Sequence, residues 1–212
     1  YTGLVGKGHF NGIVRELPHK LQVPMQRKKP TIYFVNSMSD LFHRGVSDEF
    51  IDMVFAVMAS CPQHTFQVLT KRPDRMAEYM NHRSRLDNIY DVWYAVNDQP
   101  CEAAGWPLPN VWLGTSVEDQ SAANERIPHL LQVPAKVHFL SCEPLLGPID
   151  FRQVPNFNTY HLNLYGWWVI AGAESGAGAR PMQLDWVRSL RDQCSNAGVP
   201  FFFKQMIANG RK

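Results

Sequence analysis

The sequence has 212 residues, 45% of them hydrophobic, which suffices for one substantial core in a single α/β domain. A formal net charge of +2 excludes binding of polyanions through overall charge and leaves only a local basic patch for that purpose. No run approaches the ~18 apolar residues that a membrane span needs.

The first 29 residues predict a peripheral arm, because they are rich in glycine and basic residues and are interrupted by Pro18 and Pro24. Residues 10–14 could form a turn or a short hairpin. The chain starts with Tyr1 rather than methionine, so we expect it to begin inside a longer protein. The expected organisation is an arm (1–29), a barrel domain (30–205) and a C-terminal tail (206–212).

Six short apolar runs follow the arm, and each ends in a small cluster of polar residues. A buried parallel strand reads as such a run because helices cover both of its faces. Helical patterns lie between several runs: one is capped by Ser47 and ended by Pro62, and others begin near Pro73, Asp119 and Asp185. The expected strands span residues 31–35, 66–69, 111–114, 136–140, 167–170 and 199–203.

The remaining segments carry weaker signals. Residues 81–109 and 145–166 show no clean period and predict long surface loops. Pro128 predicts a kink or a restart in the helix that begins near Asp119. Gly198 is the expected residue after the end of the last helix.

The alternation of strands and helices predicts an α/β fold with a parallel sheet and right-handed crossovers. A partial (β/α) barrel of the TIM type, with six parallel strands in this chain and a first strand missing, fits better than a Rossmann sheet. The reason is that no Gly-x-Gly-x-x-Gly follows the first strand. Such barrels place their sites at the carboxyl ends of the strands, so the six polar clusters predict one active-site rim.

The clusters after the first two strands contain polar and cationic candidates. Ser37, Ser39 and Asp40 could bind an amino or hydroxyl group of a cofactor, or could form a helix-capping loop. Lys71 and Arg72 suit a carboxylate or a phosphate, or a salt bridge to an acid on the same rim.

The later clusters contain the acidic candidates. Ser116 directly follows a strand, whereas Glu118 and Asp119 fit a helix N-terminus as well as a site. Glu143 and Glu174 could do acid/base work, hold ribose hydroxyls, or pair structurally with neighbouring cations. In the last cluster Lys204 could act as a base, although no spacing supports that role specifically.

The four cysteines are widely spaced and contain no Cys-x-x-Cys pair, which excludes a disulfide framework and a zinc module. We expect reduced thiols in a cytoplasmic protein that has no membrane partner. Cys142 alone has a positional reason for interest, because it lies at a strand end beside Glu143. We predict no metal ligands in this chain.

Six strings in one order closely resemble the phage-associated family called phage protein gp thirty-seven / sixty-eight. That family looks like a divergent branch of the radical S-adenosylmethionine (SAM) enzymes. The resemblance runs from about Phe10 to Gln205. The strings are YFVNSMSDLFH (33–43), LTKRP (69–73), WLGTSVE (112–118), FLSCEPLLG (139–147), GAESG (172–176) and FFFKQ (201–205).

The resemblance implies a partial barrel that holds SAM and a 4Fe–4S cluster and receives electrons from a donor such as flavodoxin or ferredoxin. In such enzymes three N-terminal cysteines bind the cluster, and a deoxyadenosyl radical derived from SAM carries the chemistry. This chain has no such triplet, so we expect the cluster-binding segment to precede Tyr1. The family's phage setting makes nucleic acid or a nucleotide one candidate substrate.

By analogy with the superfamily, residues 37–40 would meet the methionine amino group of SAM, and Ser116 would meet its carboxylate or ribose. Glu143 and residues 172–176 would lie near the ribose and adenine. From the residues and the resemblance together we predict cofactor binding by Ser37, Ser39, Asp40, Thr70, Lys71, Ser116, Glu143, Gly172 and Glu174, substrate binding by His43, Arg72 and Gln205, and catalysis by Glu143, Glu174 and Lys204.

Two alternatives remain open. One is a cluster-free barrel enzyme that uses Glu143, Glu174 and Lys204 for acid/base chemistry. The other is a non-catalytic nucleic-acid-binding phage protein that uses Lys71, the neighbouring Arg72 and the basic arm, together with stacking aromatic side chains.

Overall fold

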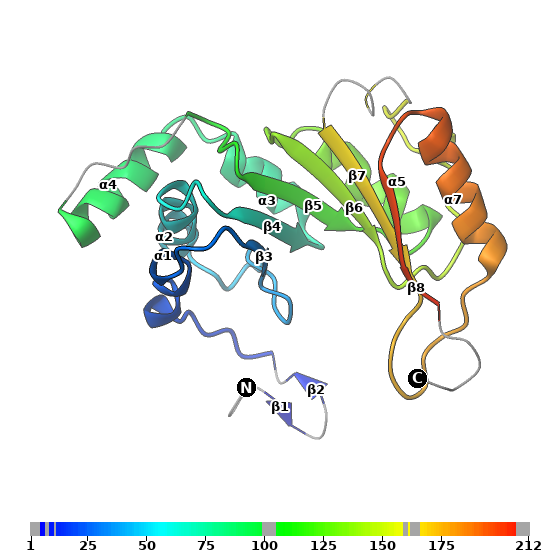
Figure 1. Ribbon diagram of the computed structural model, residues 1–212, viewed down its shortest axis with the longest axis horizontal. Coiled ribbons are helices and arrows are strands. Elements are labelled where there is room, and N and C mark those ends of the chain that lie inside the picture. The colour runs from blue at the N-terminus through cyan, green and yellow to red at the C-terminus, as the bar shows by residue number, and fades with distance from the viewer. Residues whose placement is uncertain are drawn as a thin grey trace.

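A computed structural model describes residues 5–6, 9–10, 12–98, 105–158, 161 and 166–206 of the chain (Figure 1). Six parallel strands form an open half-barrel whose spatial order, β3-β4-β5-β6-β7-β8, follows the chain. This confirms the predicted α/β fold with six parallel strands in a partial barrel. The strands are β3 (Ile32–Val35), β4 (Thr65–Thr70), β5 (Val111–Ser116), β6 (Val137–Cys142), β7 (Gly166–Gly172) and β8 (Phe201–Gln205).

Helices connect the strands and pack on the convex face of the sheet (Figure 1). No helix in the described part of the chain is both long and apolar enough to cross a bilayer. The helices are α1 (Val23–Gln26), α2 (Asp48–Ala59), α3 (Pro73–Met80), α4 (Arg85–Asn97), α5 (Gln120–Leu130) and α7 (Leu184–Asn196), with short 3-10 turns η1 (Pro18–Lys20) and η2 (Phe151–Gln153).

Three helix ends follow their predicted capping signals. The Ser47 hydroxyl accepts a hydrogen bond from the Phe50 amide at 3.1 Å at the start of α2. The Asp119 carboxylate accepts one from the Ala122 amide at 2.9 Å at the start of α5. Gly198, with a φ of +66°, follows α7 in the left-handed conformation that glycine adopts without strain.

The prediction of an irregular loop over residues 81–109 is wrong across α4. This helix is anchored by a charge as well as by apolar contacts, so its sequence lacks a clear hydrophobic period. The Arg85 guanidinium donates to the Asp52 carboxylate on α2 at 2.9 Å and lies 3.7 Å from the centre of the Tyr79 ring. Ile89, fully buried, adds the main apolar contact.

Two local predictions are also corrected. Pro128 does not restart α5, because one continuous helix runs through it from Gln120 to Leu130. The hairpin expected at residues 10–14 lies earlier, where β1 (Val5–Gly6) pairs antiparallel with β2 (His9–Phe10).

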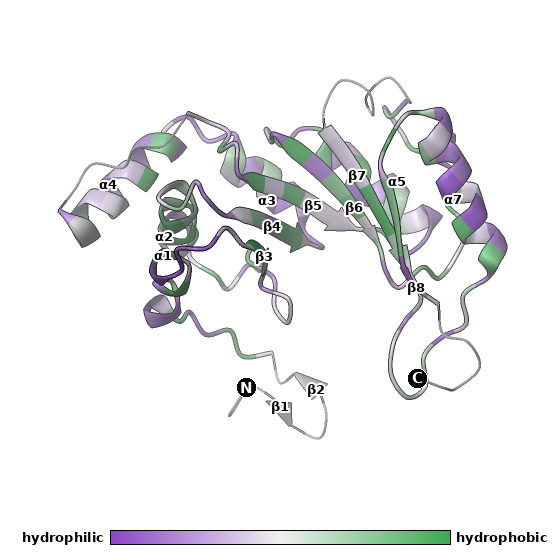
Figure 2. Cartoon of the chain, in the orientation of Figure 1, coloured by the Kyte–Doolittle hydropathy of each residue, from purple (hydrophilic) through white to green (hydrophobic). Residues whose placement is uncertain are grey.

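The two faces of the sheet differ in what covers them. Alternate side chains such as Phe66, Val68 and Leu113 point toward the helices and belong to the main core. Hydrophobic residues accordingly run along β4, β5 and β6 (Figure 2). The opposite, concave face carries the other set of side chains, among them Trp112 and Trp168.

The concave face changes in character along the strands. Register pairs Phe139 with Trp168 across β6 and β7, and one step further toward the carboxyl ends it pairs Ser116 with Ser141 across β5 and β6. Aromatic rings therefore lie below a level of hydroxyl groups. The carboxyl rim with its charged side chains follows above both.

Candidate functional site

The carboxyl ends of the six strands meet at one edge of the half-barrel, as the sequence predicted. Most of the predicted site residues lie on this rim in three separate groups. Each group is built around one or two carboxylates that already contact cations of the same rim.

The first group is centred on Asp40, in the loop after β3. Its Oδ1 accepts hydrogen bonds from the Thr70 hydroxyl at 2.7 Å and from the Phe42 amide at 3.0 Å. Its Oδ2 accepts from the Lys71 amide at 3.1 Å and from the Arg72 guanidinium at 2.7 Å. Asp40 therefore joins the ends of β3 and β4 and satisfies the backbone where the chain turns.

Glu118 continues the first group to β5, and the sequence had left it open between a helix N-terminus and a site. Its carboxylate contacts the Lys71 ammonium and accepts a hydrogen bond from Arg126 at 2.8 Å. Partial burial alone would raise the pKa of Glu118, but the hydrogen bond from Lys71 and the charge of Arg126 outweigh it and hold this pKa below its ordinary value. The two adjacent acids divide their roles, because Asp119 caps α5 while Glu118 binds the cations.

The second group lies at the carboxyl ends of β6, β7 and β8. The Lys204 ammonium donates to Oε2 of Glu143 at 2.9 Å, and the Gln205 amide lies 3.5 Å from Oε1. Gln205 also donates to the Ala173 carbonyl at 3.1 Å. Gly172 packs against the same carboxylate, since a Cβ built there would lie 3.4 Å from the Glu143 carboxyl carbon.

The third group is the pair of Glu174 and Arg180. The Arg180 amide, Nε and a terminal nitrogen each donate to the Glu174 carboxylate at 2.8 Å. These hydrogen bonds lower the pKa of Glu174 to about 2, so the carboxylate stays ionised at neutral pH and is a poor general acid. The pairing matches the structural role that the sequence left open for this acid.

Four predicted residues stand apart from these groups. Ser37 and Ser39 are exposed on the turn after β3, where the Ser39 amide donates to the Asn36 carbonyl at 3.0 Å. The Nδ1 of His43 accepts from the Gly45 amide at 3.0 Å within its own loop. Ser116 is 4% exposed and faces the concave side rather than the outer rim.

A polar cavity of about 520 Å³ opens between the loops that follow β4, β5, β6 and β7. Both cations and acids line its wall, which suits a ligand that carries both signs of charge. Its charged lining residues include Lys71, Glu118, Glu125, Arg126, Glu174 and Arg180.

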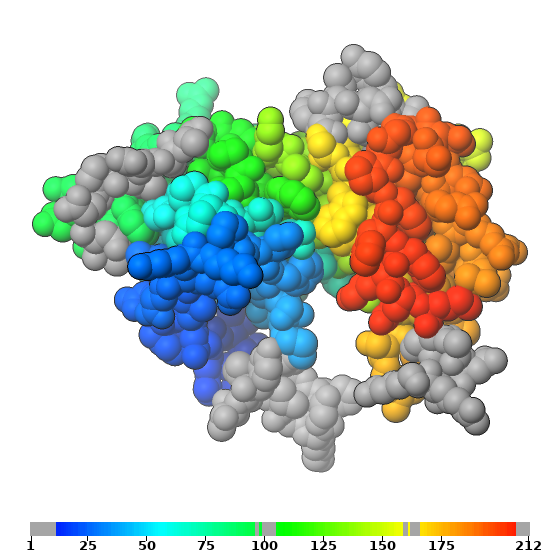
Figure 3. All heavy atoms as spheres, in the orientation of Figure 1, coloured from blue at the N-terminus to red at the C-terminus, as the bar shows by residue number. Residues whose placement is uncertain are grey.

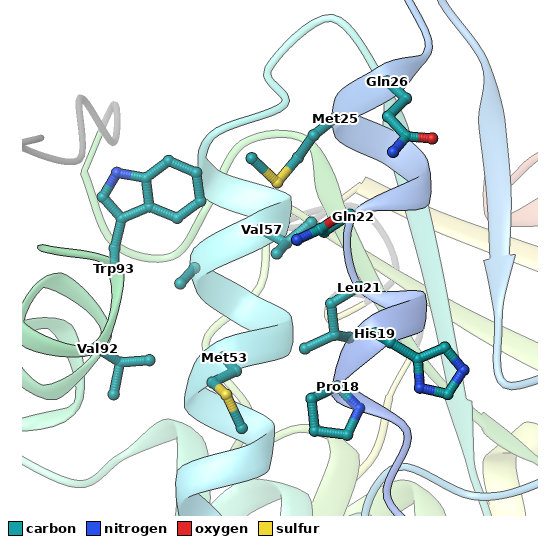
Figure 4. A pocket seen from close by; sticks show the side chains of 11 residues that line it. Pro18, His19, Leu21, Gln22, Met25, Gln26, Met53, Val57, Val92 and Trp93 are labelled. Atoms are coloured by element: carbon teal, nitrogen blue, oxygen red, sulfur yellow. The ribbon is translucent and has the colours of Figure 1, made fainter. Parts of the chain in front are cut away.

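A separate apolar pocket of about 460 Å³ lies between η1, α1, α2 and α4 (Figure 4). Met25, Met53 and Trp93 contribute to its wall. None of the predicted site residues lines it, so we do not assign it to the rim.

The described cysteines do not fit an iron–sulfur cluster. Cys61, Cys142 and Cys194 are free and buried, and Cys101 lies outside the described residues. Burial raises the pKa of the Cys194 thiol to about 12 and raises that of Cys142 further, whereas cluster ligands are thiolates. Within the described ranges, no three His, Cys, Asp or Glu side chains gather in a way that could hold a metal.

Comparison with known proteins gives one match. A family model described as "Protein of unknown function (DUF5131)" matches residues 4–211. No curated protein and no solved structure matches the chain. Because the family model spans nearly the whole sequence, the chain belongs to this family of unknown function, DUF5131.

Proposed function

We propose that this chain is the SAM-binding half-barrel of a radical SAM-type enzyme and that its carboxyl rim binds SAM. The observation that carries the proposal is the convergence of Glu143, Lys204 and Gln205 above the bare backbone of Gly172. Side chains from three neighbouring strands meet there at the edge where parallel barrels bind their ligands.

The rim offers a partner for each charged part of SAM. The ligand has an amino acid end with a carboxylate and an ammonium group, a sulfonium, and an adenosine. Lys71, Arg126 and Arg180 in the polar cavity suit the carboxylate, and Glu118 beside them suits the positive groups.

The second group suits the adenosine. A carboxylate accepts hydrogen bonds from the two hydroxyls of a ribose, and Glu143 is held for that purpose by Lys204. Gly172 lets a ligand approach the backbone where any side chain would stand in the way.

The proposal is confined to the binding and orientation of SAM. Radical chemistry of this type also requires a reduced iron–sulfur cluster, for which the described residues offer no ligand set. We therefore assign no cleavage step to them.

Isothermal titration of the purified chain with SAM tests the proposal. We expect saturable binding to the wild type and an affinity about tenfold lower or more for Glu143→Gln, the loss typical of a charged hydrogen bond. Asp192→Asn is the matched control, because Asp192 is an exposed acid on α7 that pairs with its neighbour Arg191. Absence of SAM binding by the wild type would refute the proposal.

A further inference from the structure

The concave face carries a connected set of aromatic rings that runs from the fully buried Phe139 to the exposed Phe202. Trp168 lies at its centre, with ring centroids 5.9 Å from Trp112 and 6.3 Å from both Phe139 and Phe202. Phe202 is 49% exposed. In Figure 3 the sheet surface between β3 and β8 is visible, with no described helix in front of it.

Glycine at position 114 allows this arrangement. A Cβ built on Gly114 would lie 2.6 Å from two ring atoms of Phe139 and 2.4 Å from its carbonyl oxygen. The Phe139 ring therefore lies directly over the backbone of β5, beside Trp168, its register partner on β7.

Two hydroxyl groups face the same hollow just above the rings. Ser116 and Ser141 are paired by the β5–β6 register and are 4% and 7% exposed. Neither hydroxyl has a hydrogen-bond partner within the described part of the chain. A largely buried hydroxyl that has no partner in the protein can bond to a ligand that enters the hollow.

The surrounding charge favours an anionic ligand. Arg27, Lys28 and Lys29 precede β3, Lys136 precedes β6, and all four side chains are exposed. We find no ion pair for them among the described residues, whereas Lys71, Arg72, Arg180 and Lys204 at the rim each have an acidic partner. The strand positions of the concave face below the rim contain no acidic residue.

We infer that the concave face binds the bases of a single-stranded polynucleotide. Every base has a π-face that can stack on Trp168 and Phe202, and a polar edge that can pair with the hydroxyls of Ser116 and its neighbour Ser141. The unpaired cations at the amino ends of the strands would hold the phosphates. The inference of polynucleotide binding does not depend on the proposed function. The further step, that a polynucleotide is the substrate of the enzyme, rests on the proposed function.

Fluorescence anisotropy of a labelled 15-nucleotide single strand, titrated with the full chain, tests the inference. We expect binding that weakens steeply between about 50 and 200 mM salt and that falls about tenfold in Phe202→Leu, in line with the loss of one stacked base. Phe202→Tyr keeps the ring and should keep the affinity. Tyr94→Leu is the matched control, because Tyr94 is a 57% exposed aromatic residue on α4.

Several outcomes would overturn the inference: no binding by the wild type, equal losses in Phe202→Leu and Tyr94→Leu, or a duplex of the same sequence bound as tightly as the single strand. The last would indicate contact with phosphates alone. If Phe202→Leu does not fold by circular dichroism, the double variant Lys28→Gln/Lys29→Gln replaces it, with a smaller salt dependence expected and an unchanged one counting against the inference.

A parallel titration with SAM separates this inference from the proposed function. We expect Phe202→Leu to bind SAM like the wild type. A variant that loses SAM but keeps the oligonucleotide would assign the rings to the adenine of SAM and overturn the inference. A wild type that binds the oligonucleotide but not SAM would refute the proposed function and leave base binding intact.

Discussion

The ring of Phe139 on β6 lies against the backbone of Gly114 on β5, too close for any side chain at the glycine. The conflict would involve a carbonyl oxygen and a buried ring, neither of which can move freely. The contact therefore requires glycine at position 114, opposite Phe139 in the β5–β6 ladder.

Replacement of Gly114 by alanine should therefore destabilise the fold. We expect Gly114→Ala to lower the free energy of unfolding by about 1–3 kcal/mol or more, as overpacking of a close-packed core does. Urea denaturation followed by tryptophan fluorescence measures the loss and reports on the Trp168 environment at the same time. A variant as stable as the wild type would show that the sheet relaxes around the methyl group.

Removal of Asp40 should loosen the junction between β3 and β4. Asp40→Ala leaves the Thr70 hydroxyl, two backbone amides and Arg72 without their acceptor. We expect a loss of about 2–3 kcal/mol in the free energy of unfolding, and a smaller loss for Asp40→Asn, which keeps one oxygen. Ser37→Ala, on the exposed part of the same loop, should change stability by less than about 0.5 kcal/mol. Equal stability of the alanine variants would contradict the expectation.

The rim carboxylates should make stability depend on acidic pH. The pKa of Glu118 lies below its ordinary value of 4.5, and that of Glu174 is about 2. A carboxylate with a lowered pKa in the folded state stabilises above its unfolded pKa, and this contribution is lost as the pH falls through the folded pKa. We expect the wild type to lose more stability than Glu118→Gln between about pH 5 and pH 2. If the curves of unfolding free energy against pH run parallel for the two proteins, Glu118 does not contribute to the loss of stability in acid.

The buried ion pair that anchors α4 should be costly to break from one side. Asp52→Ala would remove the buried partner of Arg85 and leave only the half-exposed Asp48, 3.2 Å away, so we expect a cost near the lower end of the range of about 3–5 kcal/mol for breaking a buried pair. The hydroxyl of Tyr79, which donates to Asp52 at 2.6 Å, would lose its acceptor as well. Asp185→Ala breaks an exposed pair with Arg188 and should cost less than about 1 kcal/mol, which makes it the control in thermal and urea unfolding.

The strands and the common rim could be predicted from the sequence because both depend on local patterns. Short apolar runs give parallel strands, and parallel strands bring polar residues such as Asp40 and Thr70 to one edge. The pairing of side chains on that edge could not be predicted, because it depends on distances between loops. Glu118 and Asp119 have the same chemistry in sequence, and only the fold shows which one contacts Lys71.

Helix α4 was missed for a related physical reason. The helix is anchored by a charged side chain, Arg85, which is buried between Asp52 and Tyr79. A hydrophobicity pattern treats such a residue as exposed. A buried ion pair between distant segments is thus invisible to periodicity, although it positions a whole helix.

Gly172 gives the sharpest test of where SAM would lie on the rim. A Cβ there would contact the Glu143 side chain at 3.4–3.5 Å, which is ordinary van der Waals distance, so Gly172→Ala should fold with a stability within about 0.5 kcal/mol of the wild type. The same methyl group would lie against the Glu143 carboxylate, to which we propose that the ribose hydroxyls bind. We therefore expect SAM affinity to fall about tenfold while the urea midpoint stays unchanged, the reverse of Gly114→Ala, which should lose stability first. If Gly172→Ala binds SAM as tightly as the wild type, the adenosine does not bind beside Glu143.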